Sequence, residues 1–170
     1  MKKRLAVPLA VVATSLLIGA SAGGASAHFL ANDSVDGRDI RYEDNTKWDD
    51  SRTWAEARWE EIPGDAELHP DSWKTNADLQ IGDYNANDDR CGYWQPRTGA
   101  DLMKLNDAFY NGANGNDRRN CTVHEFGHAF GLDHSYSDQV MDACPVEACG
   151  RSYDRPQAHD KADFLQKWPD

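Results

Sequence analysis

The stretch HEFGHAFGLDH, residues 124–134, decides what this chain can become. Residues four apart on an α-helix differ by only about 40° around the axis, so His124 and His128 point from one face and can hold one metal ion. A helix that simply continued would carry His134 away from both, because each residue adds about 1.5 Å along the axis. Gly131 allows the chain to turn back, since glycine accepts the left-handed conformation that ends helices. The spacing therefore predicts a zinc ion held by three histidines, with one coordination position open.

Glu125 directly follows the first histidine and is expected beside the metal. Zinc acidifies a bound water, and a neighbouring carboxylate can take the proton from that water and return it to a departing amine. The motif therefore predicts a hydrolase that uses a zinc-activated water with Glu125 as the general base, and the family resemblance described below implies that it hydrolyses peptide bonds. The alternative is a zinc-binding module that captures or inhibits peptides without turnover. The intact Glu125 favours the enzyme.

Two stretches of the chain resemble a known family. Residues 124–134 carry the extended motif of the metzincin zinc endopeptidases in full, and Met141, in SYSDQVM, stands where that family has its Met-turn. This run and the ADLQIGDY stretch, residues 77–84, look most like the matrixins and the small bacterial matrixin-like proteases. The resemblance implies an α+β catalytic domain: a twisted, mostly parallel sheet with an edge strand at the cleft, a packing helix, the zinc helix, the Met-turn and a C-terminal helix.

The resemblance also assigns supporting roles. Met141 is expected to form an apolar floor beneath the histidines, and Gly131 to support the turn towards the third ligand. Some relatives have a tyrosine two residues after the Met-turn methionine that assists the oxyanion, but this chain has Ala143 there, so no such role is expected. The stretch CPVEAC, residues 144–149, is expected to form a wall of the specificity pocket.

Hydrophobic periodicity and turn residues predict the remaining elements. Strands are expected at residues 39–43, 65–69, 77–84 and 101–106, and helices at residues 49–62, 117–131 and 156–168. Asp50 or Ser51 is expected to cap the first helix and Asp154 the last, while Trp54 and Trp59 are expected in the core. The family resemblance implies that the strand at 101–106 is the edge strand beside the cleft, where an extended peptide could pair with free backbone groups.

The beginning of the chain predicts export. The cations Lys2, Lys3 and Arg4 precede an apolar run at residues 5–20, and Ala25-Ser26-Ala27 offers a small-residue cleavage site. We therefore expect residues 1–27 to be a signal peptide and residues 28–170 a single, freely secreted, extracellular domain. Removing the three cations changes the formal charge from −11 to −14. This acidity argues against nucleic acid and anionic membranes as partners, and favours a monomer that acts on protein or peptide substrates.

Four cysteines in an exported chain predict two disulfides, for which three pairings are possible. We favour Cys91 with Cys121 and Cys144 with Cys149. Cys91 lies in an Arg-Cys-Gly sequence that superficially matches the cysteine switch of matrixin precursors. Its position inside the expected catalytic domain makes a structural disulfide the simpler interpretation.

Three further features could bind metal, and for each the sequence favours a simpler interpretation. The loop at residues 85–90 has oxygen donors for Ca²⁺, although such loops are more often only solvated. Cleavage after Ala27 would make His28 an N-terminal residue whose amine and ring can chelate copper, but its position is more simply an accident of where the chain is cut. His69 and His159 are expected at the surface without a role.

Overall fold

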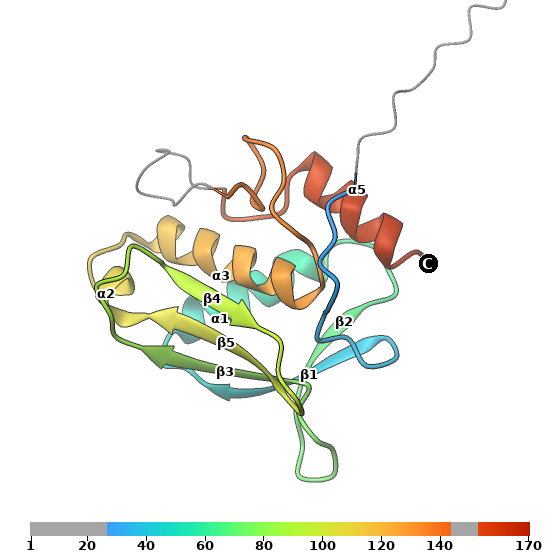
Figure 1. Cartoon of the computed structure of the whole chain (residues 1–170), viewed down its shortest axis with the longest axis horizontal. Coiled ribbons are helices and arrows are strands. Elements are labelled where there is room, and N and C mark those ends of the chain that lie inside the picture. The colour runs from blue at the N-terminus through green and yellow to red at the C-terminus, as the bar shows by residue number, and fades with distance from the viewer. Residues whose placement is uncertain (1–26, 144–152) are drawn as a thin grey trace, which may run out of the picture.

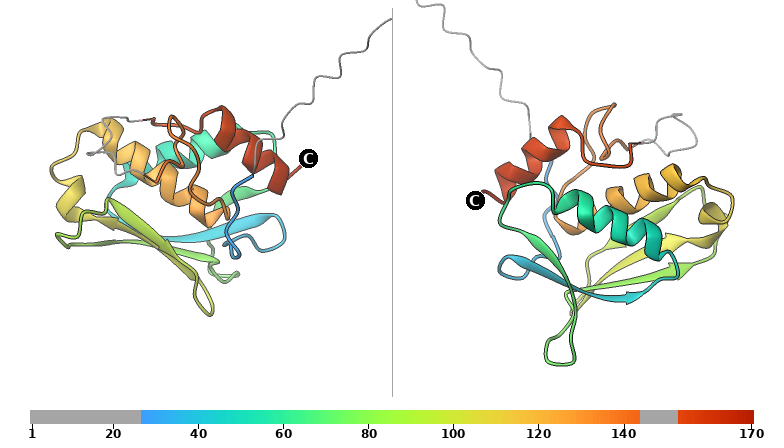
Figure 2. Two further views of the ribbon diagram at one scale, coloured as in Figure 1. Left: turned by 45° about the horizontal axis from the view of Figure 1, so that its top comes forward. Right: turned by 180° about the vertical axis from the view of Figure 1, so that it is seen from behind.

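A computed structural model describes residues 27–143 and 153–170 of the chain, which form a sheet covered on one side by helices (Figures 1 and 2). The five strands lie in the order β2-β1-β3-β5-β4. They are β1 (Asp39–Asn45), β2 (Glu67–Pro70), β3 (Leu79–Tyr84), β4 (Gly92–Gln95) and β5 (Asp101–Asn106). All neighbouring strands are parallel except β4 and β5, which are antiparallel. The expected α+β fold with a mostly parallel sheet is confirmed.

The edge strand differs from the prediction. The strand at Asp101–Asn106 pairs with β3 on one side and with β4 on the other, so it is an interior strand. Gly92–Gln95 forms the edge on this side of the sheet, because it pairs with β5 alone, and β2 forms the opposite edge. The sequence did not predict β4, since four residues beginning with glycine are too few for a clear alternation of apolar and polar side chains.

Two long helices enclose the core against the sheet. Trp59 of α1 (Asp49–Trp59) is 1% exposed, and its indole nitrogen donates a hydrogen bond of 3.0 Å to the carbonyl oxygen of Val123 in α3 (Gly115–Ala129). Its ring also contacts Phe130. The predicted core role of Trp59 is therefore confirmed. The largest other side chains in this core are Tyr110, Phe126, Phe164, Ile40, Leu79, Ile81, Met103, Leu105 and Leu132.

The N-cap residues predicted for the first and last helices were wrong. Trp48 is the N-cap of α1, so neither Asp50 nor Ser51 has that role. The last helix, α5 (Ala158–Lys167), has Gln157 as its N-cap, and the side chains of Gln157 and Asp160 form a reciprocal capping box. The prediction of Asp154 as its cap was wrong, because the capping box three residues later outcompetes a lone aspartate.

A short helix, α2 (Asp107–Tyr110), was not predicted. Its four residues give no helical periodicity to detect. Within residues 27–143 and 153–170, no helix is long and apolar enough to cross a membrane.

A disulfide between Cys91 and Cys121 joins the residue before β4 to α3, as predicted. Cys144 and Cys149 lie outside the described residues. Because the disulfide closes a loop across 30 residues of sequence, replacing both its cysteines with alanine is expected to lower the free energy of unfolding by about 3 kcal/mol. Urea denaturation of the metal-free proteins measures this effect. Equal stability of the variant and the parent chain would contradict it.

Candidate active site

The zinc helix α3 ends in a glycine turn, as the sequence predicts. Gly131 has φ +79°. The amide of Gly131 donates to the carbonyl of His128 at 2.8 Å, and the amide of Leu132 donates to the carbonyl of Gly127 at 2.9 Å. These paired bonds satisfy carbonyl groups that the end of a helix leaves open. The chain thereby reverses towards His134.

We expect Gly131→Ala to destabilise the protein more than Gly37→Ala does. A Cβ atom at Gly131 would lie 2.7 Å from Lys167 and 2.8 Å from Asp33, whereas one at Gly37 would meet nothing within 4 Å. Both glycines have positive φ, which costs other residues about 1–2 kcal/mol. Gly131→Ala adds overpacking of about 1–3 kcal/mol to that strain. Urea denaturation of the two variants measures the difference, and equal losses of stability would contradict the account.

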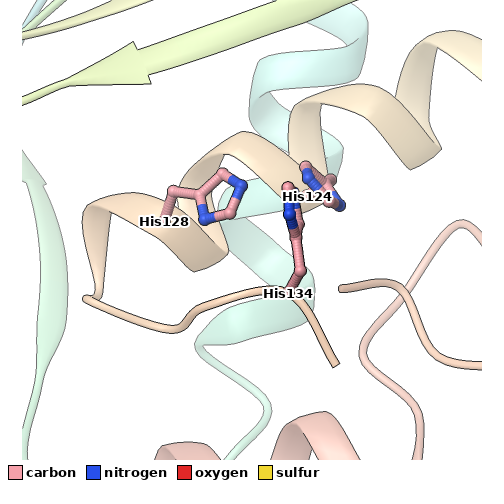
Figure 3. A group of neighbouring side chains, drawn as sticks. All are labelled: His124, His128 and His134. Atoms are coloured by element: carbon pink, nitrogen blue, oxygen red, sulfur yellow. The ribbon is translucent and has the colours of Figure 1, made fainter. Parts of the chain in front are cut away.

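The three histidines gather at the end of this helix. Figure 3 shows His124 and His128 projecting from α3 and His134 from the segment that follows, with the three rings turned towards one another. The ring centroids are 4.6 to 5.2 Å apart. One ligand nitrogen from each residue lies within 4.8 Å of the other two. The predicted metal ligands are therefore close enough together to share one ion.

Hydrogen bonds fix the orientation of two of these rings. Nδ1 of His124 lies 2.8 Å from the carbonyl oxygen of Val140, and Nδ1 of His128 lies 2.8 Å from that of Leu132. A carbonyl oxygen can only accept, so both rings carry their proton on Nδ1. Each ring therefore keeps a lone pair on Nε2, which is the arrangement that metal-binding histidines commonly have.

The surroundings also favour the metal-binding form of the histidines. Burial lowers the pKa of His124 to about 4 and that of His128 to about 3. Both rings are therefore neutral at neutral pH. Neutral imidazole is the form that ligates zinc, so no proton has to be displaced.

Glu125 has an unusual environment beside the histidines. It is 4% exposed, and its carboxylate accepts a hydrogen bond from the backbone amide of Trp94. The oxygen Oε2 of Glu125 is buried and has no hydrogen-bond partner within the distance and angle limits of a hydrogen bond. Burial raises the pKa of Glu125 to about 8. Native proteins rarely leave a buried carboxylate oxygen unpaired, so this atom points to a function that involves a further group.

Glu125 and the three histidines line one pocket of about 270 Å³. Strand β4 contributes part of its wall, and the segment after His134 contributes another part. The other lining residues are Asp89, Arg90, Cys91, Gly92, Tyr93, Trp94, Asn120, Gln139, Val140, Asp142, Ala143 and Tyr153. The residues fit a zinc ion, because three imidazoles and an unpaired carboxylate oxygen share one cavity.

Met141 lies beneath α3, where the resemblance places the floor of the site. It is 1% exposed, and a Cβ atom added to Gly127 would collide with its sulfur. The buried carboxylate of Asp160 in α5 accepts hydrogen bonds from the backbone amides of Val140 and Met141, at 2.8 and 3.2 Å. The sequence reasoning missed Asp160. The spacing of Gln157 and Asp160, which is that of a capping box, was the available signal.

Of the remaining candidates, His69 and His159 do not line this pocket, whereas Asp89 and Arg90 of the loop at residues 85–90 do. His69 has a side chain 48% exposed, in agreement with its prediction as a surface residue. In the loop at residues 85–90, Asp88 binds the guanidinium of Arg90 at 2.7 Å. The prediction of an exposed His159 was wrong, since its side chain is 12% exposed and contacts His28. The helical pattern did not reveal that the N-terminal segment covers this face of α5.

Comparisons with known proteins agree with this geometry. The sequence model of the family described as Matrixin matches residues 19–159, which is most of the chain. Two structures of myroilysin share the fold, each with a TM-score of 0.56 and 11% identity. One match covers 84% of this chain and 96% of myroilysin, and the other covers 78% and 82%. No curated protein sequence matches the chain. The chain belongs to the matrixin family of zinc metalloendopeptidases.

Proposed function

We propose that this protein is a secreted zinc-dependent endopeptidase, with Glu125 as its general base and His124, His128 and His134 as its zinc ligands. The observation that carries the proposal is the buried, unpartnered Oε2 of Glu125 in the pocket that the three histidines share. A closed structural zinc site would need no such atom. We also propose that export removes residues 1–27.

The proton chemistry follows from the position of Glu125. His124, His128 and His134 would hold a zinc ion, which would act as a Lewis acid that acidifies water and polarises the substrate carbonyl. Oε2 of Glu125 takes the proton from the attacking water and passes it to the nitrogen of the departing amine. The proposal is supported by burial, which raises the pKa of Glu125 to about 8 and so favours its protonated form, whereas a nearby cation would favour the ionised form. The group is therefore suited to exchange a proton near neutral pH.

The free edge of β4 supplies a place for the substrate backbone. Gly92–Gln95 pairs only with β5, so one side of the strand keeps its backbone groups available, and Gly92 and Trp94 line the pocket. An extended peptide can add to such an edge through main-chain hydrogen bonds. Since Trp94 also donates its backbone amide to Glu125, the same strand positions both the substrate and the base.

Casein digestion tests the proposal. We expect the zinc-loaded protein to cleave casein, 1,10-phenanthroline to abolish the cleavage, and added zinc to restore it. The isomer 1,7-phenanthroline is the matched control, because its nitrogens cannot chelate and it should not inhibit. Intact casein in the presence of protein with bound zinc would contradict the proposal and support peptide capture without turnover.

A further inference from the structure

A second group of metal-ligand side chains lies outside the active site. It consists of His28, His159 and Asp163, whose ligand atoms lie within 4.8 Å of one another. His159 and Asp163 are one turn apart on α5, so they share a face of that helix. His28 comes from the opposite end of the chain, and Figure 2 shows this N-terminal segment (blue) passing beside α5 (red).

The three donor atoms form a nearly equilateral triangle. Nδ1 of His28 is 3.2 Å from Nε2 of His159 and 3.5 Å from Oδ2 of Asp163, and the last two atoms are 3.2 Å apart. Tetrahedral zinc with ligand bonds of about 2.0–2.1 Å requires donors about 3.3–3.4 Å apart. The side chains therefore already have the spacing of a zinc site. Two imidazole nitrogens and a carboxylate oxygen are also ligands that zinc accepts.

Hydrogen bonding alone cannot satisfy this triangle. If both facing nitrogens carry a proton, each can donate to Asp163, but the two N–H groups of His28 and His159 then oppose each other. If only one carries a proton, the lone pair of the other nitrogen faces the carboxylate. In either case one of the three close contacts is unfavourable. A cation among the three atoms removes this conflict, because two unprotonated ring nitrogens and a carboxylate oxygen can each offer it a lone pair.

The surroundings shield the triangle from water. The side chains of His28, His159 and Asp163 are 24%, 12% and 5% exposed. The ring of Tyr136 packs against both imidazoles, with centroid distances of 4.9 Å to His28 and 4.8 Å to His159. Oδ2 of Asp163 also accepts a hydrogen bond of 3.3 Å from the backbone nitrogen of His28, so the N-terminal segment holds this carboxylate beside both imidazoles.

We infer that His28, His159 and Asp163 form a second zinc site that fastens the N-terminal segment to α5. The carbonyl of His28 accepts a hydrogen bond of 2.9 Å from the amide of Asp133, the residue before His134. Zinc at the second site therefore steadies the segment that carries the third active-site histidine. The inference uses side chains outside the pocket and holds whether or not the protein cleaves peptides.

A third group of side chains outside the active site could also bind the second zinc ion. Asp39, Glu67 and His69 also lie close together, with Nε2 of His69 3.1 Å from Glu67 and 3.7 Å from Asp39. These side chains are 30% to 56% exposed, and exposed acidic groups often gather without an ion. The His69→Gln variant therefore belongs in the experiment.

Zinc stoichiometry tests the second site. The purified protein is stripped with a chelator, dialysed against buffered zinc and analysed by inductively coupled plasma mass spectrometry. We expect two zinc ions per chain for the parent protein, one for His159→Gln, one for His128→Gln and none for the variant with both changes. Lys161→Gln, on the exposed side of α5, is the matched control and should keep two ions.

Anomalous diffraction at the zinc edge provides a check that needs no variant. We expect a second peak between Nδ1 of His28, Nε2 of His159 and Oδ2 of Asp163. One ion per chain in the parent protein, two ions in folded His159→Gln, or loss of the second ion in His69→Gln would overturn the inference. Because the His128→Gln variant lacks a proposed active-site ligand, its remaining zinc shows that the second site stands apart from the proposed function.

Discussion

Replacing Glu125 with glutamine is expected to slow peptide-bond cleavage by about 10²- to 10⁴-fold while zinc remains bound. The amide has nearly the shape of the carboxylate and can still accept the hydrogen bond from Trp94, so the site keeps its form. It cannot take a proton from water. Turnover of a fluorogenic peptide and the zinc content of the same sample give the two quantities. Cleavage at the parental rate would remove Glu125 from the mechanism.

In the metal-free protein, the effect of Glu125→Gln on the free energy of unfolding is expected to depend on pH. Burial raises the pKa of Glu125 from 4.5 to about 8, so the folded state binds more protons than the unfolded state between these values. The shifted pKa of Glu125 therefore makes the free energy of unfolding depend on pH. Its contribution is fully present below pH 4.5 and is lost as the pH rises to 8, by about 1.4 kcal/mol per pH unit. Glu125→Gln removes that loss. Its stability relative to the parent protein should therefore increase from pH 5 to pH 8 in urea denaturation.

Asp160→Ala is expected to lower the free energy of unfolding by about 3–5 kcal/mol. The carboxylate of Asp160 is 1% exposed and accepts hydrogen bonds from three backbone amides, those of Val140, Met141 and Gln157. Alanine would leave all three donors buried and unpaired. Zinc affinity should also fall, because the carbonyl of Val140 orients the ring of His124.

Two controls separate this effect from a general weakness of α5. Asp160→Asn keeps an acceptor oxygen and should lose less stability than Asp160→Ala. Lys161→Ala changes the exposed neighbour and should be within about 0.5 kcal/mol of the parent protein. Equal stability of Asp160→Ala and Lys161→Ala would show that the Met-turn does not depend on this carboxylate.

The zinc cluster could be predicted from the sequence because its geometry is local. The period of an α-helix places His124 and His128 together, and Gly131 marks where the chain turns back to bring His134 beside them. The disulfide between Cys91 and Cys121 was also predicted. The histidine cluster required no knowledge of the sheet order, whereas the sequence left three disulfide pairings open, and the structure contains Cys91 with Cys121, which was the favoured choice.

Other features depend on tertiary structure and were missed for that reason. The edge position of Gly92–Gln95 follows from the order of the strands, which no local pattern encodes. Asp160 supports the active site through amides of a segment about 20 residues earlier. His28 and His159 are 131 residues apart, and only the packing of the first described segment on α5 brings their rings together. Each of these contacts joins segments that are distant in the sequence.

The most direct test is cleavage profiling of a mixed peptide library with the zinc-loaded protein and with Glu125→Gln. Mass spectrometry of the products identifies each new terminus and gives the rate at which it appears. The account predicts internal peptide-bond cleavage by the parent protein, loss of at least about 99% of that rate in the variant, and one active-site zinc in both. An intact library with zinc bound at His124, His128 and His134 would contradict it.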